Sequence, residues 1–328
     1  MFYITRFKDI ERREYECEVV TPLFLGGADP QKAELRVPPI KAAMRFWWRA
    51  LYGEDNINQM LKKESEIFGS TDQKSSIKIT IEKNGNKPVL KDLPSGTKII
   101  VTSKQKSFPI SIIEYLAFGL FDPKQRQGKY LRQHLEPGAH FKIGVTCSKN
   151  IVDEVNNVFN TMICFGGFGS RSRNGFGSIR SSGLLIRPLN NTGNLKSFPA
   201  FSKEVKLFNK FSKCNRWDEA LSEIGLAYRN ARLALEDRHK FIKRGLIAMP
   251  IESKFEKAIP REIREGRHAK PYFLHVNKTT DGKYQGQILF LPYLYKATPG
   301  DRSNQVPEYM AACGKMNEEI EKAMGGAK

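Results

Sequence analysis

The spacing of apolar residues in the first half of the chain alternates between the period of a strand and that of a helix. Apolar residues at every second position predict strands at residues 15–20, 77–81, 98–102, 141–145 and 179–186. Apolar residues three and four apart predict helices at residues 40–51, 64–68, 110–120 and 152–163. The order of strand, helix, two strands, helix and strand indicates a ferredoxin-like unit with an added helix.

The second half reads as a further α+β region. Residues 188–199, rich in Asn, Gly and Pro, predict a boundary between an N-terminal domain at 1–187 and a C-terminal domain at 188–328. The apolar pattern from Trp217 to Leu235 predicts a long amphipathic helix, and residues 308–324 predict a last one. Apolar stretches at 271–277 and 284–291 flank a turn at residues 279–282, which is typical of a hairpin. The C-terminal domain is therefore expected to be ferredoxin-like or helix-rich.

The 328 residues carry a formal net charge of +19, with a pI near 9.7. Such an excess favours a nucleic acid or an anionic membrane as partner. No apolar run approaches the ~18 residues of a membrane span, and residues 1–13 lack the apolar core of a secretory signal. The five cysteines form no CxxC pair, which suits reduced thiols in a cytosol. We expect no structural metal and no cofactor.

The predicted helix at 40–51 carries cations at i, i+4 and i+8: Lys41, Arg45 and Arg49. Its apolar stripe consists of Met44, Trp47, Trp48 and Leu51. No carboxylate lies within this stretch, so the cations have no partner on their own helix. The row faces either solvent or a polyanion, and the charge of the whole chain favours a polyanion. We expect Trp47 in the core and Trp48 partly at the surface, where it could stack on a base.

A glycine-rich loop follows the helix predicted at 152–163. Residues 166–178 read Gly-Gly-Phe-Gly-Ser-Arg-Ser-Arg-Asn-Gly-Phe-Gly-Ser, and no acidic residue occurs between Glu154 and Glu204. Glycine lets a backbone approach a ligand closely and expose its N–H groups, and Arg171 and Arg173 suit phosphate. Neither a Walker A motif nor the dinucleotide-binding fingerprint can be written through the loop. Its aromatic residues favour core anchoring over base stacking: Phe165, Phe168 and Phe176.

Three blocks of sequence together resemble the RAMP superfamily of CRISPR systems. They are Phe-Leu-Gly-Gly-Ala at 24–28, the stretch from Arg36 to Leu51 that contains Arg-Phe-Trp-Trp-Arg-Ala-Leu, and the loop at 166–178. Ile-Phe-Gly-Ser at 67–70 is a smaller match. The closer resemblance is to the subunit of the type III-B (Cmr) effector complex that carries this Trp-rich motif. It implies an α+β fold of two ferredoxin-like, RRM-related domains in tandem, with extra helices and a glycine-rich loop.

The resemblance implies a non-catalytic, RNA-binding subunit of a cytoplasmic ribonucleoprotein for antiviral defence. Its expected partners are guide (CRISPR) RNA near the 3′ region, target RNA and the other Cmr-complex subunits, with no membrane involved. The matched positions that the resemblance nominates as RNA contacts are Lys41, Arg45, Trp48, Arg49, Gly166, Gly167, Gly169, Arg171 and Arg173.

Two alternatives stay open. Some RAMP relatives are endoribonucleases that use a histidine base or a loop aspartate with a metal. The residues that a nuclease could use here are Asp29, His134, His140, His268 and His275, and turn or structural roles are favoured for all of them. The other alternative is an architectural subunit whose basic surface meets acidic proteins.

A second basic stretch runs from Lys254 to Lys270 with glutamates interspersed, which is typical of a solvated face. Within it, Arg267, His268 and Lys270 are the residues most suited to binding.

Overall fold

The structure is a computed structural model. It describes residues 9–83, 85, 87–94, 96–103, 106–120, 132–182, 193–237, 240–249, 251, 257, 259–265, 268–295 and 306–325. These residues form an α+β fold with two larger antiparallel sheets and one separate hairpin. The predicted domain boundary, between residues 187 and 188, lies within residues 183–192, which are outside the described ranges, and it stays a prediction.

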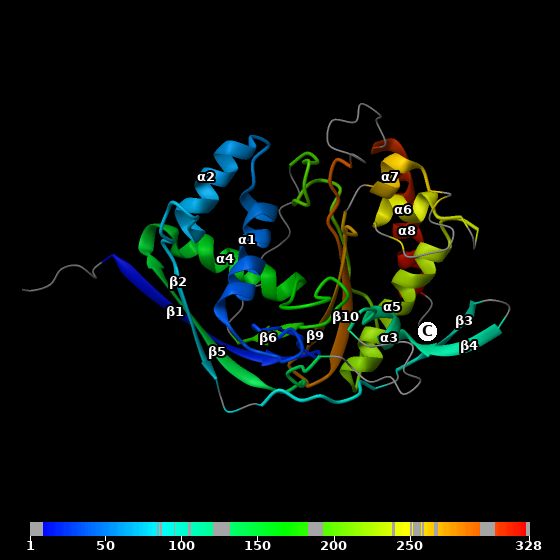
Figure 1. The fold of residues 1–328 in the computed structure, drawn as a ribbon, viewed down its shortest axis with the longest axis horizontal. Helices are drawn as coiled ribbons and strands as arrows, with labels where there is room; N and C mark the ends of the chain where they lie inside the picture. Colours follow the sequence, from blue (N-terminus) through cyan, green and yellow to red (C-terminus); the bar gives the residue numbers. More distant parts are fainter. Residues whose placement is uncertain are drawn as a thin grey trace, which may run out of the picture.

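The first sheet has four strands in the order β2-β5-β1-β6. They are β1 (Ile10–Val19), β2 (Lys78–Lys83), β5 (His140–Ser148) and β6 (Ile179–Ser181), and each pairs antiparallel to its neighbour. Helices α1 (Val37–Tyr52), α2 (Ile57–Phe68) and α4 (Lys149–Phe165) lie on one side of the sheet (Figure 1). Tyr15, Cys17 and Val19 alternate along β1 into the core beneath these helices. The alternation predicted for this strand is confirmed.

The second sheet is built around β10 (Tyr284–Phe290). This strand pairs with β9 (Tyr272–Lys278) along one edge and with β7 (Lys206–Phe208) and β8 (Lys213–Cys214) along the other. Helices α5 (Trp217–Leu233) and α8 (Val306–Gly325) pack together on this side of the molecule, and α6 (Ile242–Ile247) and α7 (Arg261–Glu265) lie next to them (Figure 1). The predicted hairpin and the predicted helices at 217–235 and 308–324 are confirmed.

The hairpin β9–β10 contributes to two cores at once. Leu274 and Ile288 point toward α5 and α8, whereas Phe273 and Leu289 point into the core of the first sheet and its helices. This division follows from the side-chain period of two in a strand. The second sheet is therefore covered by apolar groups on both faces and joins the two halves of the molecule.

The glycine-rich loop lies between β1 and β9 and is packed tightly. The N–H groups of Phe168 and Gly177 donate to the carbonyl oxygens of Gly177 and Pro22 at 3.0 Å each. Leu274 of β9 donates to the carbonyl oxygen of Arg173 at 3.1 Å. Phe168 and Phe176 are fully buried, which confirms their role as core anchors.

The helix predicted at 110–120 is wrong in its first part. The separate hairpin consists of β3 (Lys98–Ser103) and β4 (Lys106–Ser111), and α3 (Ile112–Leu116) begins only after it. Ser111 accepts hydrogen bonds from the N–H groups of Ile113 and Glu114, and Glu114 accepts one from Ser111 in return. This capping box sets the start of the helix, a signal that the apolar spacing alone does not contain.

We expect Gly177→Ala to cost much more stability than Gly282→Ala. Both glycines have positive φ, at 65° and 78°, which costs a β-carbon-bearing residue about 1–2 kcal/mol. A β-carbon at Gly177 would also collide with the carbonyl of Phe168, whereas nothing lies within 4 Å of one at Gly282. The collision should add about 1–3 kcal/mol in urea denaturation. Equal losses in the two variants would show that the loop is not tightly packed.

Candidate nucleic-acid interface

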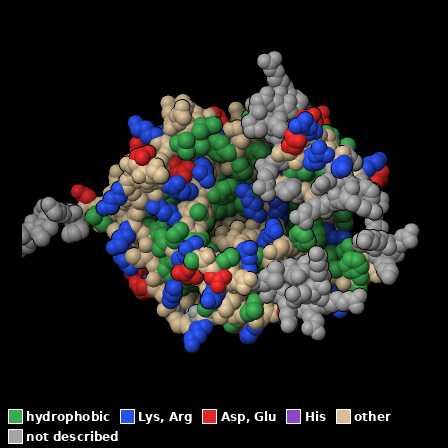
Figure 2. All heavy atoms as spheres, in the orientation of Figure 1, with side chains coloured by type: hydrophobic (Ala, Val, Ile, Leu, Met, Phe, Trp, Pro, Cys, Tyr) green, Lys and Arg blue, Asp and Glu red, His purple; other side chains and the backbone are tan. Residues whose placement is uncertain are grey.

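A cleft of about 920 Å³ lies between the glycine-rich loop and the helices of the second sheet. Its polar wall consists of Arg171, Ser172, Arg173, Asn174, Arg232, His268 and Lys270, and its aromatic residues are Tyr115, Phe118 and Tyr228. Figure 2 shows a hollow near the middle of the displayed face, with Lys and Arg side chains on its walls. The ring of Phe118 is 51% exposed, so it is accessible for stacking.

No Asp or Glu is among the described residues that line this cleft. Arg132 lies beside the glycine-rich loop, where its Nη1 donates to the hydroxyl of Ser170 at 3.4 Å. Burial and the neighbouring Arg132 lower the pKa of Arg171 below its usual range. Mutually repelling cations without carboxylates are characteristic of a surface that binds a polyanion.

The two arginines of the loop differ in their exposure and in their contacts. Arg171 is exposed and adopts φ 61°, and it is the only residue other than glycine with positive φ in the described ranges. Arg173 is half-buried, with its guanidinium 5.1 Å from the ring of Phe46 and 4.4 Å from the ring of Phe273. Its Nη1 donates to the carbonyl oxygen of Lys270 at 2.8 Å. Burial lowers the pKa of Arg173 to about 10, so the group stays charged at neutral pH.

The cations of α1 have no partner on their own helix, as expected, but two of them are paired with a carboxylate of the neighbouring helix. Glu64 on α2 is only 3% exposed and forms ion pairs with Arg45 at 3.4 Å and Arg49 at 3.1 Å. Arg45 also donates to the carbonyl oxygen of Gly69. Helix α1 touches the glycine-rich loop through Phe46 and Trp47, so Arg45 and Arg49 turn toward α2 instead. For Lys41, burial and the neighbouring Arg45 lower the pKa.

The expectation for Trp48 is wrong, whereas that for Trp47 is confirmed. Both side chains are 2% exposed. The indole N–H of Trp48 donates to Glu154 at 2.6 Å, in a second cleft whose lining includes Glu54, Glu66 and Asp153. A base stacked on this ring would therefore bring its phosphate next to carboxylates, so the geometry does not favour Trp48 as an RNA contact.

The glycines nominated as RNA contacts serve close packing. A β-carbon at Gly166 would meet the indole of Trp47, and one at Gly167 would meet the backbone of Gly177. Gly169 has φ 81° and passes against the carbonyl of Phe24. Several backbone N–H groups of the loop donate to carbonyl oxygens of the protein: those of Gly166, Phe168, Ser170, Asn174, Gly175 and Gly177. For these residues, the expectation that the N–H groups are exposed to a ligand is wrong.

His275 on β9 forms a hydrogen bond to the start of the glycine-rich loop. Its Nδ1–H donates to the carbonyl oxygen of Gly166 at 2.7 Å, and burial lowers its pKa to about 4. The ring is therefore neutral and structural at physiological pH.

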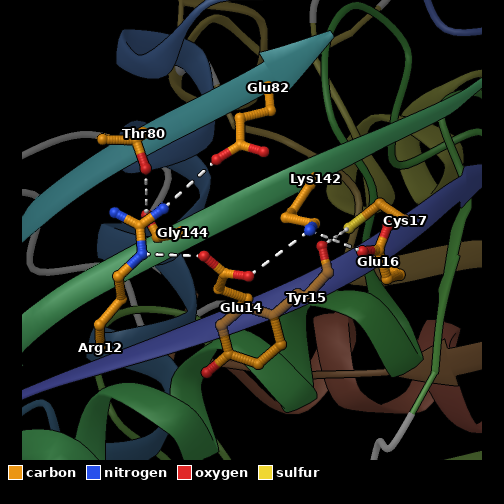
Figure 3. A network of polar contacts seen from close by, with 9 residues as sticks. All are labelled: Arg12, Glu14, Tyr15, Glu16, Cys17, Thr80, Glu82, Lys142 and Gly144. Carbon is orange, nitrogen blue, oxygen red and sulfur yellow. Dashed lines mark hydrogen bonds and ion pairs between the residues drawn. The ribbon is translucent and has the colours of Figure 1, made fainter. Parts of the chain in front are cut away.

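The outer face of the first sheet is covered by paired charges. Figure 3 shows Arg12 bound to Glu14 at 2.9 Å and Lys142 bound to Glu16 at 3.0 Å. Glu82 from β2 lies 3.4 Å from Arg12. The described outward positions of β1, β2 and β5, such as Arg12, Glu82 and Lys142, hold no Phe, Tyr or Trp of the kind that RNA-binding sheets use for stacking. The cleft, not the sheet face, is therefore the candidate interface.

Sequence reasoning missed Arg232, a residue of the cleft that comes from the second half of the chain. Arg232 follows Tyr228 by four positions, on the apolar side of the amphipathic helix α5. The sequence did contain a signal for this residue, because Arg232 is a cation on the side of the helix that is otherwise mostly apolar. His268 and Lys270 were singled out in the second basic stretch as suited to binding, and both line the cleft. Residues 254 and 267 of that stretch lie outside the described ranges.

The sequence matches the RAMP superfamily over residues 16–180. The chain belongs to this superfamily. It is 30% identical over 181 residues to CRISPR system Cmr subunit Cmr1-2 of Pyrococcus furiosus, a match that covers 51% of this chain and 92% of the relative. It is 26% identical over 201 residues to Cmr subunit Cmr1-1 of the same organism, covering 59% of this chain and 55% of that relative. The predicted resemblance to a type III-B RAMP protein is confirmed.

Solved structures share the fold of this RAMP protein. The apo crystal structure of Cmr1 from Pyrococcus furiosus superposes with a TM-score of 0.57 at 20% identity, covering 94% of this chain and 96% of that one. A chain of the type III-B Cmr-beta complex bound to cognate target RNA gives a TM-score of 0.54 at 12% identity, covering 95% and 100%. The α+β architecture is therefore shared along nearly the whole length.

The residues proposed for the nuclease alternative occupy structural positions in this RAMP protein. Asp29 is exposed in a turn, where it accepts a hydrogen bond from the N–H of Gln31 at 2.9 Å. His134 is buried beside Phe24, and burial lowers its pKa. His268 contacts the carbonyl oxygen of Leu246 at 3.1 Å. His140 is exposed at the first position of β5.

No helix in the described ranges is long and apolar enough to cross a membrane.

We expect Glu64→Gln to destabilise this RAMP protein, because Arg45 and Arg49 would then repel each other without a buried carboxylate between them. The loss should be about 1.5–3 kcal/mol in urea denaturation, the range for hydrogen bonds to charged groups. The control is Glu66→Gln on the exposed side of the same helix, which should change stability by less than about 0.5 kcal/mol. Similar stabilities of the two variants would mean that the ion pairs contribute little.

Proposed function

We propose that this protein is a non-catalytic RNA-binding subunit of a cytoplasmic type III-B (Cmr) CRISPR ribonucleoprotein. The names of its relatives support membership of such a complex, since both are Cmr subunits. Structures with the same fold come from Cmr-beta complexes bound to cognate target RNA. The expected partners are guide RNA, target RNA and the other Cmr subunits.

The single observation that carries the proposal is the cleft lined by Arg171, Arg173, Arg232 and Lys270 without a carboxylate among its described lining. Cations of this kind neutralise phosphates and release counterions, which gives affinity without reading sequence. That property fits a complex in which base pairing with a guide supplies the specificity.

Within the proposed interface, Arg171 and Arg173 contact the RNA backbone, and Gly166, Gly167 and Gly169 allow the loop to hold them in place. Lys41, Arg45 and Arg49 extend the basic surface along α1. Arg45 and Arg49 are 33% and 37% exposed, so each still reaches solvent while it is paired with Glu64. Trp48 is assigned to positioning α1 against α4 rather than to RNA.

The nuclease alternative is less well supported. Asp29 lies in a solvent-exposed turn, and burial disfavours the charged form of both His134 and His275. A general acid or base must instead exchange a proton with a bound substrate. We therefore assign the protein to RNA binding and leave cleavage to other subunits.

We also propose that each of the two larger sheets is a ferredoxin-like unit. The order β2-β5-β1-β6 corresponds to a complete unit. In the second, β7 and β8 together take the place of the first strand, with β10 and then β9 beside them. The position of a fourth strand would lie on the far side of β7 and β8.

We expect Arg171→Gln to weaken RNA binding and to reduce its dependence on salt. In a plot of log K against log salt concentration for single-stranded RNA, the slope should fall in magnitude by about 1. The matched control is Arg12→Gln on the outer sheet face, which removes an equal charge that is already paired with Glu14. Fluorescence anisotropy with the full chain, alone and within the reconstituted complex, provides the measurement.

An equal loss in the Arg12 and Arg171 variants would indicate general charge attraction and count against the cleft. Absence of RNA binding in both the chain and the complex would favour the architectural alternative. Magnesium-dependent RNA cleavage that disappears in Asp29→Ala would establish the nuclease alternative instead.

A further inference from the structure

One lysine in the cleft is buried without a hydrogen-bond partner. Lys270 lies just before β9, and only 8% of its surface is exposed. Its Nζ makes no hydrogen bond to the described residues, and it lies 3.9 Å from the centre of the Tyr228 ring. An ammonium group has three donors, and burying it without acceptors is costly. Within the described part of the chain the donors of this side chain have no acceptor, so they remain available to an anion in the cleft.

The charged groups around Lys270 are cations. Arg173 donates to its backbone carbonyl oxygen, and Arg171 and Arg232 line the same cleft. The Nε of Arg232 is likewise buried with no hydrogen-bond partner in the described part of the chain. The carboxylate that acts on Arg232 is Glu236, and its oxygens already accept the N–H groups that open α6. The pocket thus holds several cationic hydrogen-bond donors and, among its described lining, no carboxylate to accept from them.

The state of Lys270 depends on what occupies the pocket. Burial, together with the nearby Arg173, Arg232 and Arg171, holds its pKa well below the usual range. These surroundings disfavour the charged form of the amine, whereas an anion bound beside it would favour that form. The titratable and charged groups that face it are Arg171, Arg173, Arg232, Tyr115, Tyr228 and His268.

A phosphate group suits these donors better than a carboxylate does. Its oxygens point in several directions, so guanidinium groups from separate elements and an ammonium can bind it together. The donors here come from the loop, from α5 and from the segment before β9. The ring of Tyr228 occupies one side of the amine, which leaves its protons for a ligand on the other side.

We propose that Lys270, Arg171, Arg173 and Arg232 form a pocket that binds one phosphate group of an RNA. This inference rests on the proposed RNA-binding function and adds a defined subsite to it. A strand that enters the cleft is anchored there at a single phosphate, which is either an internal phosphodiester or a terminal phosphate.

The test compares Lys270→Met with Lys278→Met in the full-length protein. Methionine keeps an unbranched apolar stem and removes the amine. Lys278 is a close match, because it lies on β9 and its Nζ is 5.8 Å from the ring of Tyr284. It differs in being paired with Glu18. The probes are inorganic phosphate and one RNA oligonucleotide that ends in a 3′-phosphate, a 5′-phosphate or hydroxyls only.

We expect Lys270→Met to weaken binding of phosphate and RNA by about tenfold or more, and Lys278→Met to leave both unchanged. Lys270→Met should also raise the Tm by about 2–4 °C, because it removes a buried amine without a partner. Calorimetry in two buffers of different ionisation enthalpy should show proton uptake on phosphate binding by the natural sequence but not by the variant.

The oligonucleotide arms distinguish the two sources of phosphate. A terminal phosphate is the ligand if one phosphorylated end binds more tightly and this advantage disappears in Lys270→Met. An internal phosphodiester is the ligand if all three ends bind equally and all lose affinity in that variant.

The pocket is overturned if Lys270→Met binds phosphate and RNA as well as the natural sequence does, or if it lowers the Tm as a purely structural lysine would. In that case RNA binding by the natural sequence keeps the proposed function intact. Phosphate binding that depends on Lys270, in a protein without affinity for RNA, supports the pocket and rejects the proposed function. Arg171→Gln, at an exposed position, repeats the binding test without risk to the core.

Discussion

The close passage of the glycine-rich loop between β1 and β9 is the constraint on which this structure depends. Gly169 passes the carbonyl of Phe24 and Gly177 passes that of Phe168 at distances that leave no room for a side chain. The loop is therefore held by backbone hydrogen bonds and buried phenylalanines rather than by flexibility. Held in this way, it keeps Arg171 in a left-handed conformation that costs about 1–2 kcal/mol, and it places Arg173 between two aromatic rings. A rigid turn thus supports two cations at the edge of the cleft.

The excess of positive charge is distributed unevenly. On the outer sheet face and between α1 and α2, cations are matched by carboxylates such as Glu14 and Glu64. The lining of the cleft has arginines and a lysine without such partners among its described residues. The cleft is therefore a concave region in which several cations lie together without a carboxylate among the described lining. A net charge of +19 favours a polyanionic partner, and the distribution of ion pairs is the reason for proposing the cleft as its binding site.

Local sequence predicted the elements well and their partners poorly. The stripe on α1, the alternation of β1 and the hairpin β9–β10 follow from spacing within a few residues, and the structure has all three. Glu64 meets Arg49 from a different helix, and Glu154 meets Trp48 from more than 100 positions away. No pattern within a helix contains such contacts, so the charge row looked unpaired and Trp48 looked exposed. The glycines were recognised, but the same residues are required for close packing as for ligand approach, and only coordinates separate these reasons.

The sheet that is covered on both faces has a consequence for how the molecule moves. Because neighbouring residues of β9, such as Phe273 and Leu274, belong to different cores, the hairpin cannot leave either half without exposing apolar surface. The two halves should therefore melt in one cooperative transition and should not bend freely about a hinge. A cleft between halves that are joined so firmly is expected to keep a nearly constant width, so a strand bound there as proposed would have to adapt its shape to the protein.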